Sequence, residues 1–463
     1  MTGFDLTVPR SILVVGAGGP GMSALAIALS MMGHRVRGTD IKETAYLDTV
    51  RAAGVEVHIG HAPSHLDGVD VVTVSTAIPP DHLEVRVARE RGIPVVSRAT
   101  MLAAVVGRAR GIGIAGTHGK TTTTSLLTLI LREAGLNPSF IIGGQVNEIG
   151  AGASWTGGEW IVVEADESDD TFRALPLEAA VLTNVEPDHL ENWGTFDALV
   201  EAFGEFLGTK SGPVVVCADD PIASRLGRQV GARTYGQAEG AAYRIVNLVS
   251  DGGVQRFTIL RDGSVLGAIE LPLRGEHMAA NATAAVAMAV ELGVPFAAAA
   301  RTVAKFGGVA RRFEFRGEVN GAALVDDYAH LPGEIAAVLK AAHTSGDGWR
   351  RVVAVFQPNR YRRMAILAQD YRDAFVDANV VVLTDIYPSG DDPIPGVTGK
   401  LVVDAVLDAH PTTELVYVPR RSELSRVVAS LLRAGDVCIS MGCGDIATLP
   451  DEMVSEAGRR VSR

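Results

Sequence analysis

The sequence contains little cysteine and little positive charge. Its cysteines are Cys217, Cys438 and Cys443, an odd number without the paired spacing of a zinc site, so no disulfide framework is expected and a reducing compartment is favoured. The formal net charge is −12, from 42 Lys+Arg against 54 Asp+Glu in 463 residues. Because a nucleic-acid surface needs a basic face, nucleic acid is not an expected partner. A small anionic substrate remains compatible, since it responds to local charge.

Long apolar runs and a secretory signal are also missing. The Ala-rich stretch after His277 is interrupted by Glu291 and Pro295, whereas a membrane span needs about 20 predominantly apolar residues. The first ten residues, MTGFDLTVPR, lack the basic and then apolar order of a signal peptide. We therefore expect a cytoplasmic protein without membrane insertion.

Three segments of the chain each begin with a β-branched run that leads into a glycine turn or loop. The runs start at Ser11, near Gly111 and near Ala322, and the length corresponds to about three domains. We predict an α/β protein with an N-terminal Rossmann-like domain, a central domain of P-loop ATPase type and a C-terminal Rossmann-like domain. The predicted boundaries are residues 1–108, 109–316 and 317–463.

The first glycine loop, Gly16–Gly21, fits the pattern G-x-G-x-x-G between a predicted strand and a predicted helix. Such glycines let backbone amides approach a phosphate at the positive end of the helix. Asp40 stands where an acidic residue would bond a ribose hydroxyl. The pattern alone indicates a dinucleotide or nucleotide-sugar site, and it leaves open an NAD(P)-dependent oxidoreductase or a purely structural turn.

A second loop, Gly116–Thr121, reads G-T-H-G-K-T and is more informative. It departs from a strict Walker A motif because Ile114 stands at the position of the first glycine. Its backbone amides would nevertheless cradle phosphates, Lys120 would reach the β- and γ-phosphates, and the Thr121 hydroxyl is placed for Mg²⁺. Two phosphate loops in separate domains indicate that two nucleotides bind at once.

Acidic residues gather where two predicted strands end. Glu164, Asp166 and Glu167 follow the apolar strand WIVV, and Asp188-His189 follows a second strand of the same segment. Sites in α/β proteins lie at the carboxyl ends of strands, and Mg²⁺ takes carboxylate oxygens together with substrate phosphates. The sequence therefore predicts a magnesium site, with a solvated acidic loop as the alternative.

Several motifs occur in order over nearly the whole chain and together resemble the Mur ligase family: GAGGPGMS, STAI (Ser75–Ile78), GTHGKTTTT, EADESD, TNVEPDH, HMAANATAA, GVARRFE, DDYAH and FQPNRYRR. The resemblance implies an ATP-dependent carboxylate–amine ligase of peptidoglycan synthesis, with Mg²⁺ and ATP as cofactors. The implied substrates are UDP-N-acetylmuramate, through its lactyl carboxylate, and L-alanine. The implied reaction passes through an acyl phosphate and releases ADP and phosphate, in a monomer or a homodimer.

The resemblance also implies roles for individual residues. The first domain would bind the UDP-sugar, the second ATP, and the third the amino acid. Implied ATP-binding residues are Gly116, Thr117, His118, Gly119, Lys120, Thr121, Thr122, His277, Asn281 and Arg311, and implied metal ligands are Thr121, Glu164 and His189. Implied substrate-binding residues are Gly18, Gly19, Gly21, Asp40, Ser75, Asp327, Tyr328, His330, Arg360 and Arg363. Lys120, His330, Arg360 and Arg363 would be catalytic.

The sequence departs from the family pattern at a few positions. Met278 replaces an asparagine of the adenine motif, Leu331 replaces the second of two histidines, and the H-R-Y-[ST]-R motif begins with Asn359 and carries Arg362. These changes leave two alternatives open: a recycling ligase that attaches a peptide to the same UDP-sugar, and a nucleotide-binding protein with an inactive acceptor pocket. An oxidoreductase would leave GTHGKT and the acidic cluster unexplained.

Overall fold

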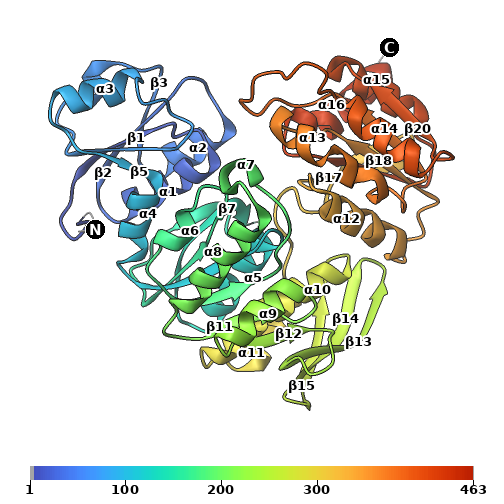
Figure 1. The fold of residues 1–463 in the computed structure, drawn as a ribbon, viewed down its shortest axis with the longest axis horizontal. Helices are drawn as coiled ribbons and strands as arrows, with labels where there is room; N and C mark the ends of the chain where they lie inside the picture. The colour runs from blue at the N-terminus through green and yellow to red at the C-terminus, as the bar shows by residue number, and fades with distance from the viewer. Residues whose placement is uncertain (1–4, 147, 462–463) are drawn as a thin grey trace. The chain divides into compact units, whose positions relative to one another are not determined.

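The computed structural model describes residues 5–146 and 148–461, which form three β-sheets with helices packed on them (Figure 1). The first sheet is entirely parallel, in the order β3-β2-β1-β4-β5. Its strands are β1 Ser11–Val15, β2 Arg35–Asp40, β3 Glu56–Ile59, β4 Val71–Val74 and β5 Val95–Ser97, and its helices are α1 Pro20–Met31, α2 Ala45–Ala52, α3 Leu83–Glu90 and α4 Arg98–Val106. The order reverses beside β1, so the glycine loop that follows β1 lies at the point where α/β proteins bind ligands.

The second sheet has ten strands in the order β15-β14-β13-β12-β11-β10-β6-β9-β7-β8. The strands are β6 Arg110–Ala115, β7 Ser139–Val146, β8 Ala151–Ser154, β9 Trp160–Glu164, β10 Leu177–Leu182, β11 Val214–Cys217, β12 Arg233–Gly236, β13 Tyr243–Asp251, β14 Val254–Arg261 and β15 Ser264–Leu271. The helices are α5 Lys120–Glu133, α6 Thr171–Ala174, α7 Leu190–Trp193, α8 Phe196–Gly208, α9 Pro221–Gln229, α10 Glu276–Glu291 and α11 Phe296–Val303. Strand β6 lies between β9 and β10, so the phosphate loop after β6 is flanked by the loops that follow both neighbours.

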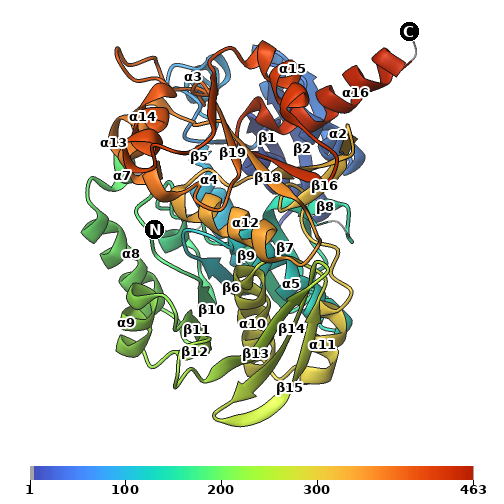
Figure 2. The same cartoon turned by 90° about the vertical axis from the view of Figure 1, so that its right-hand side faces the viewer.

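The third sheet has the order β16-β17-β21-β18-β19-β20, and β16 alone runs antiparallel to its neighbour. Its strands are β16 Glu314–Val319, β17 Ala322–Asp327, β18 Arg351–Phe356, β19 Val380–Thr384, β20 Leu415–Val418 and β21 Asp436–Met441, with helices α12 Pro332–Thr344, α13 Tyr361–Leu367, α14 Lys400–Ala409, α15 Arg421–Leu431 and α16 Leu449–Val461. Alternate residues of each strand face opposite sides and build two cores, one under α12 to α14 and one under α15 and α16 (Figure 2).

The α/β class and the Rossmann-like character of the first and third sheets are confirmed. Residue 317, the predicted start of the third domain, falls inside β16, where Gly317 has φ +132° at a shift in the pairing with β17. The third sheet begins at Glu314, three residues before residue 317. The domain boundaries themselves stay predictions.

Contacts divide the chain into two compact units. The first unit consists of residues 1–246, 258–269 and 280–306, and the second of residues 247–257, 270–279 and 307–463. Both glycine loops and the acidic loop belong to the first unit, and the whole third sheet belongs to the second. Among the described residues, no helix is long and apolar enough to cross a membrane.

Candidate active site

The first glycine loop connects β1 to α1 and is held by side chains that follow β2. The amide of Gly18 donates a hydrogen bond to Oδ2 of Asp40 at 2.8 Å, and the Thr44 hydroxyl donates to the Gly18 carbonyl at 3.0 Å. A Cβ at Gly18 would lie 2.8 Å from the same carboxylate oxygen, so a larger residue would push the loop away. Asp40 thus supports the loop, and its bond to a ribose stays a prediction.

Two other predicted substrate-binding residues are Gly19, within this loop, and Ser75, in a segment that adjoins it. Gly19 precedes Pro20 as the N-cap of α1 in an extended conformation, which leaves the first amides of the helix at the loop. Ser75 lies just after β4 and its carbonyl accepts the Ile78 amide at 3.2 Å. The side chain of Ile78 lies beside Gly16. The segment after β4 therefore adjoins the glycine loop.

The second glycine loop connects β6 to α5, and its backbone is fixed by residues that follow β10. The amide of His118 donates to Oδ1 of Asn184 at 2.8 Å, and the Thr183 hydroxyl donates to the His118 carbonyl at 2.5 Å. Gly116 has φ +126° and Gly119 has φ +81°, conformations that L side chains rarely adopt. The loop is therefore held in one shape before any phosphate binds.

Lys120 begins α5 and turns back over this loop. Its Nζ donates to the carbonyls of Gly116 and Thr117 at 2.5 and 3.2 Å, and to both carboxylate oxygens of Glu167 at 2.9 Å. Burial alone would lower the pKa of Lys120, but the carboxylates of Glu167, Asp166 and Glu164 outweigh burial and raise it. Lys120 is therefore a cation fixed at the second glycine loop, and its contact with ATP phosphates stays a prediction.

Glu164, at the end of β9, is the predicted metal ligand with the clearest geometry. It accepts hydrogen bonds from the Thr121 hydroxyl and the Gly143 amide, and burial raises its pKa. Its Oε1 is buried and has no hydrogen-bond partner. An unpaired buried carboxylate oxygen is costly, and Mg²⁺ prefers carboxylate and hydroxyl oxygens. The pair of Thr121 and Glu164 therefore fits a magnesium ion.

The third predicted metal ligand, His189, has a left-handed backbone with φ 52° and is the N-cap of α7. Its Nε2 lies 3.3 Å from Oδ2 of Asp188. A carboxylate beside an imidazole sets which ring nitrogen carries the proton. Ligation of a metal by His189 stays a prediction.

Arg98, the first residue of α4, belongs to none of the motifs in the sequence. Its Nη2 lies 2.9 Å from Oδ2 of Asp169 and 3.6 Å from Oδ2 of Asp166. Its Nη1 would lie 2.9 Å from a Cβ at Gly21. Arg98 thus contacts both the first glycine loop and the acidic loop after β9. The contact joins residues about 70 positions apart, which no local pattern reveals.

The predicted adenine-binding residues lie one turn apart on α10. The Asn281 side chain packs against Gly119 so closely that a Cβ there would collide with it. His277 packs against Gly275 in the second unit, with its Cε1 2.5 Å from where a Cβ would stand. Met278, which replaces an asparagine, is buried. Adenine binding by His277 and Asn281 stays a prediction.

In the second unit, Arg311 is the centre of a polar network at the ends of β17 and β21. Its Nε lies 2.9 Å from Oδ2 of Asp326, its Nη2 donates to the Gly442 carbonyl at 2.6 Å, and its guanidinium lies 4.9 Å from the ring centroid of Tyr328. The predicted substrate residue Tyr328 is 37% exposed. Arg311 is thus a rigid, oriented cation, and its approach to ATP phosphates stays a prediction.

Asp327, at the end of β17, accepts backbone hydrogen bonds on both carboxylate oxygens. The donors are the amides of Phe313 and Ala329, each at 2.7 Å. Burial raises the pKa of Asp327 to about 6, although Arg312 and these amides oppose the shift. The carboxylate therefore fixes the backbone that leads to Tyr328 and His330.

His330 is positioned through one ring nitrogen. Its Nδ1 lies 3.1 Å from both the Tyr328 carbonyl and Oε2 of Glu334. Because both neighbours are acceptors, Nδ1 carries the proton in the neutral ring and Nε2 keeps a lone pair. The Tyr371 hydroxyl also donates to the His330 carbonyl at 2.6 Å. His330 can therefore accept a proton at Nε2.

Of the departures from the family pattern that follow β17, Asn359 and Leu331 are buried and Arg362 is exposed. Asn359 is 2% exposed and its Oδ1 accepts a hydrogen bond at 2.9 Å from Nη1 of Arg363, which is 3% exposed. Leu331 is 2% exposed and precedes α12. Arg360 has φ 62° at the start of α13, and Arg362 is on the exposed side. Asn359 therefore orients a predicted catalytic arginine.

Comparisons with known proteins agree with the motifs. Three family models match the chain: "Mur ligase family, catalytic domain" over residues 11–110, "Mur ligase middle domain" over 114–289 and "Mur ligase, glutamate ligase domain" over 311–444. Together they cover most of the chain.

Individual relatives match over nearly their full length. The UDP-N-acetylmuramate–L-alanine ligase of Bradyrhizobium diazoefficiens is 43% identical over 97% of this chain and 99% of its own. That of Acidothermus cellulolyticus is 44% identical over 96% of this chain and 94% of its own. Among solved structures, the UDP-N-acetylmuramate-alanine ligase of Thermotoga maritima has a TM-score of 0.83 at 27% identity and covers 98% of this chain and 100% of its own.

Proposed function

The chain belongs to the Mur ligase family, and from this premise we propose that it joins L-alanine to the lactyl carboxylate of UDP-N-acetylmuramate with ATP as the energy source. The products are UDP-N-acetylmuramoyl-L-alanine, ADP and phosphate, in peptidoglycan synthesis. The observation that carries the proposal is the identity of 43% to an L-alanine ligase over 97% of the chain. The braced phosphate loop and the oriented imidazole of His330 supply the chemistry.

The first chemical step activates a poor electrophile. A lactyl carboxylate oxygen attacks the γ-phosphorus of ATP, the bond to the β-phosphate oxygen breaks, and ADP leaves an acyl phosphate behind. Charge gathers on the transferred group, so catalysis rests on positioning and on cations. Lys120 supplies one fixed cation, and it would exchange its contact with Glu167 for phosphate oxygens. Arg311 is the candidate for a second cation.

Thr121, Glu164 and His189 are the residues that would hold Mg²⁺. When bound, Mg²⁺ would neutralise charge on the phosphate oxygens. The unpaired Oε1 of Glu164 provides an oxygen ligand that already lacks a proton donor. Thr121 follows Lys120 directly, so a metal ligand and a phosphate-binding cation lie on the same turn of α5.

The second step forms the amide. The neutral amine of L-alanine attacks the acyl carbon, the tetrahedral intermediate expels phosphate, and the amine loses a proton. Nε2 of His330 is the group that would take this proton, because Glu334 and the Tyr328 carbonyl hold Nδ1–H. Arg360 and Arg363 would attract the carboxylate of the amino acid, with Arg363 oriented by Asn359.

The relatives that are 43% and 44% identical over nearly the whole chain are L-alanine ligases, which supports L-alanine rather than a peptide as the acceptor. Asn359 is 2% exposed and bonds Arg363, so it would act on the acceptor through that arginine. An inactive acceptor pocket would also leave the geometry of His330 and Glu334 without a use. The peptide-recycling ligase remains the alternative against which the proposal is tested.

If the reaction passes through an acyl phosphate, one oxygen of the lactyl carboxylate leaves with the phosphate and can be followed by isotope labelling. UDP-N-acetylmuramate labelled with ¹⁸O in its lactyl carboxylate should transfer one label to inorganic phosphate as UDP-N-acetylmuramoyl-L-alanine forms, which mass spectrometry of both products measures. Omitting L-alanine is the control. Amide formation with unlabelled phosphate would contradict the acyl phosphate, and no amide with L-alanine would contradict the substrate.

A further inference from the structure

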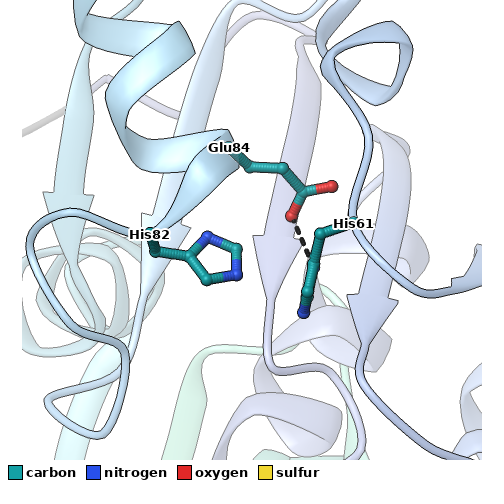
Figure 3. Close-up of side chains that lie close together, drawn as sticks. All are labelled: His61, His82 and Glu84. Carbon is teal, nitrogen blue, oxygen red and sulfur yellow. Dashed lines mark hydrogen bonds and ion pairs between the residues drawn. The ribbon is translucent and has the colours of Figure 1, made fainter.

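A cluster of two imidazoles and one buried carboxylate lies among the segments that connect the strands of the first sheet (Figure 3). Glu84 lies in the first turn of α3, His82 is the N-cap of that helix, and His61 lies in the loop after β3. Their ligand atoms all lie within 4.8 Å of one another. Among the described residues, this is the one group of three histidine, cysteine or acidic side chains that meets this spacing.

The carboxylate of Glu84 has an unusual setting for a buried charge. Its side chain is 0% exposed, and its ion-pair partners in the described chain are the imidazoles of His61 and His65, at 2.9 and 2.7 Å. The Thr39 hydroxyl donates to Oε2 at 2.8 Å. The amide of Ala62 donates to Oε1 at 3.4 Å, so both oxygens of this buried carboxylate are hydrogen-bonded, and imidazoles supply the side-chain nitrogens that contact it.

His82 is the second unusual member of the cluster. Both its ring nitrogens are buried and have no hydrogen-bond partner. Its ring lies edge-on to His61, with centroids 4.3 Å apart at 84°. Burying unpaired polar nitrogens is costly, and a cation bound to a ring lone pair would remove this cost. The structure therefore places an imidazole whose buried nitrogens have no hydrogen-bond partner beside a buried carboxylate and a second imidazole.

The ligand set selects the kind of cation. Two imidazoles and one carboxylate suit zinc and its neighbours in the first transition row, whereas Mg²⁺ prefers oxygen ligands alone. Ligand atoms about 2.0–2.2 Å from one ion lie roughly 3–4 Å apart. The ligand atoms of His61, His82 and Glu84 lie within 4.8 Å of one another, and the His82 ring has no hydrogen bond that would have to break.

We propose that His61, His82 and Glu84 bind a transition-metal cation of the zinc class, with His65 and Thr39 orienting the carboxylate. Such partners of a ligating carboxylate are a regular feature of metal sites. The bound ion would connect the loop after β3 to the segment between β4 and α3. That segment contains Ser75 and Ile78, so the ion would also fix the backbone beside the first glycine loop. The site is independent of the proposed ligation.

The full-length protein, stripped of metal by a chelator, tests the site. Zn²⁺ is titrated against a chromogenic chelator, with excess Mg²⁺ present so that Mg²⁺ occupies the oxygen-ligand site. One equivalent should bind, and Co²⁺ should give the visible absorption of a site with nitrogen ligands. His65→Asn should weaken Zn²⁺ binding by about 10- to 100-fold, as loss of an orienting partner does.

Removing a ligand should have a larger effect than removing an orienting residue. His82→Asn and His61→Asn should each weaken Zn²⁺ binding by more than His65→Asn does and abolish the Co²⁺ absorption. His58→Asn is the control, because His58 stacks on His65 but is not a ligand, and it should bind as the unmodified protein does. Circular dichroism establishes that each variant is folded. Absence of Zn²⁺ and Co²⁺ binding in the unmodified protein, or unchanged binding in both ligand variants, would overturn the proposal.

Discussion

The phosphate loop of the first unit and the acceptor region of the second hold their cations in different ways. Lys120 is braced by two carbonyls of its own loop and by Glu167. Arg363 is braced by the side chain of Asn359, one helical turn away. Two of the three groups that hold Lys120 are backbone carbonyls, whereas the hydrogen bond from Arg363 to Asn359 is made between two side chains. The loop can therefore be inferred from a motif, and the acceptor region must be inspected residue by residue.

Lys120→Ala is expected to have the largest effect on turnover, because it removes the lysine cation of the loop after β6. Loss of a phosphate-clamping charge costs several kcal/mol of transition-state stabilisation, on the order of 10³-fold or more in kcat. Binding of the UDP-sugar should remain nearly intact, since its predicted site is the other glycine loop. Phosphate-release kinetics and calorimetry measure the two effects.

The matched control for Lys120 is Lys305→Ala, an exposed lysine of the same unit. This variant should turn over normally. Near-normal turnover of Lys120→Ala itself would show that the loop after β6 does not take part in the reaction through this lysine.

His330→Ala tests the acceptor side. General base catalysis contributes about 10²- to 10⁴-fold, so amide formation should fall by about 10²-fold or more while UDP-sugar binding changes little. Glu334→Gln should give a smaller loss, because it weakens only the contact that holds Nδ1–H. His343→Ala, an exposed histidine on α12, is the control. Equal losses in His330→Ala and His343→Ala would exclude a specific role for His330.

Glu164→Gln and His189→Ala test the metal ligands of the first unit. Each should raise the Mg²⁺ concentration needed for half-maximal turnover by about tenfold or more. Removing a residue that only hydrogen-bonds a metal ligand already weakens metal binding by about this factor. Turnover measured across a Mg²⁺ series gives the value. Unchanged Mg²⁺ dependence in both variants would mean that the acidic cluster is a solvated loop.

The smallest effect is expected for Leu331→His combined with Asn359→His, which restores the family pattern in the acceptor region. Because both positions are buried, the KM for L-alanine should change without a new substrate preference. Initial rates with L-alanine, glycine and L-serine measure the preference. A switch of the preferred amino acid would show that these side chains select the acceptor directly.

Features that depend on local sequence patterns could be predicted, and features that depend on contacts between distant segments could not. The α/β class and the glycine loop before α1 follow from local patterns of glycine and apolar spacing. The contacts of Arg98 with Asp169 and the cluster around Glu84 join loops that only the sheet order brings together. Asn359, interpreted from sequence as a lost imidazole, is a hydrogen-bond acceptor for Arg363, which depends on burial that sequence does not show. The third sheet begins at Glu314 because β16 pairs with β17, and this pairing of distant backbone groups is likewise not visible in the sequence.

The most direct test of the central claim is phosphate release from ATP by the purified protein with UDP-N-acetylmuramate and one acceptor at a time. L-alanine should stimulate phosphate release together with an equal amount of UDP-N-acetylmuramoyl-L-alanine, and the cell-wall tripeptide should not. Release that depends on the tripeptide and not on L-alanine would contradict the account and favour the peptide-recycling reaction.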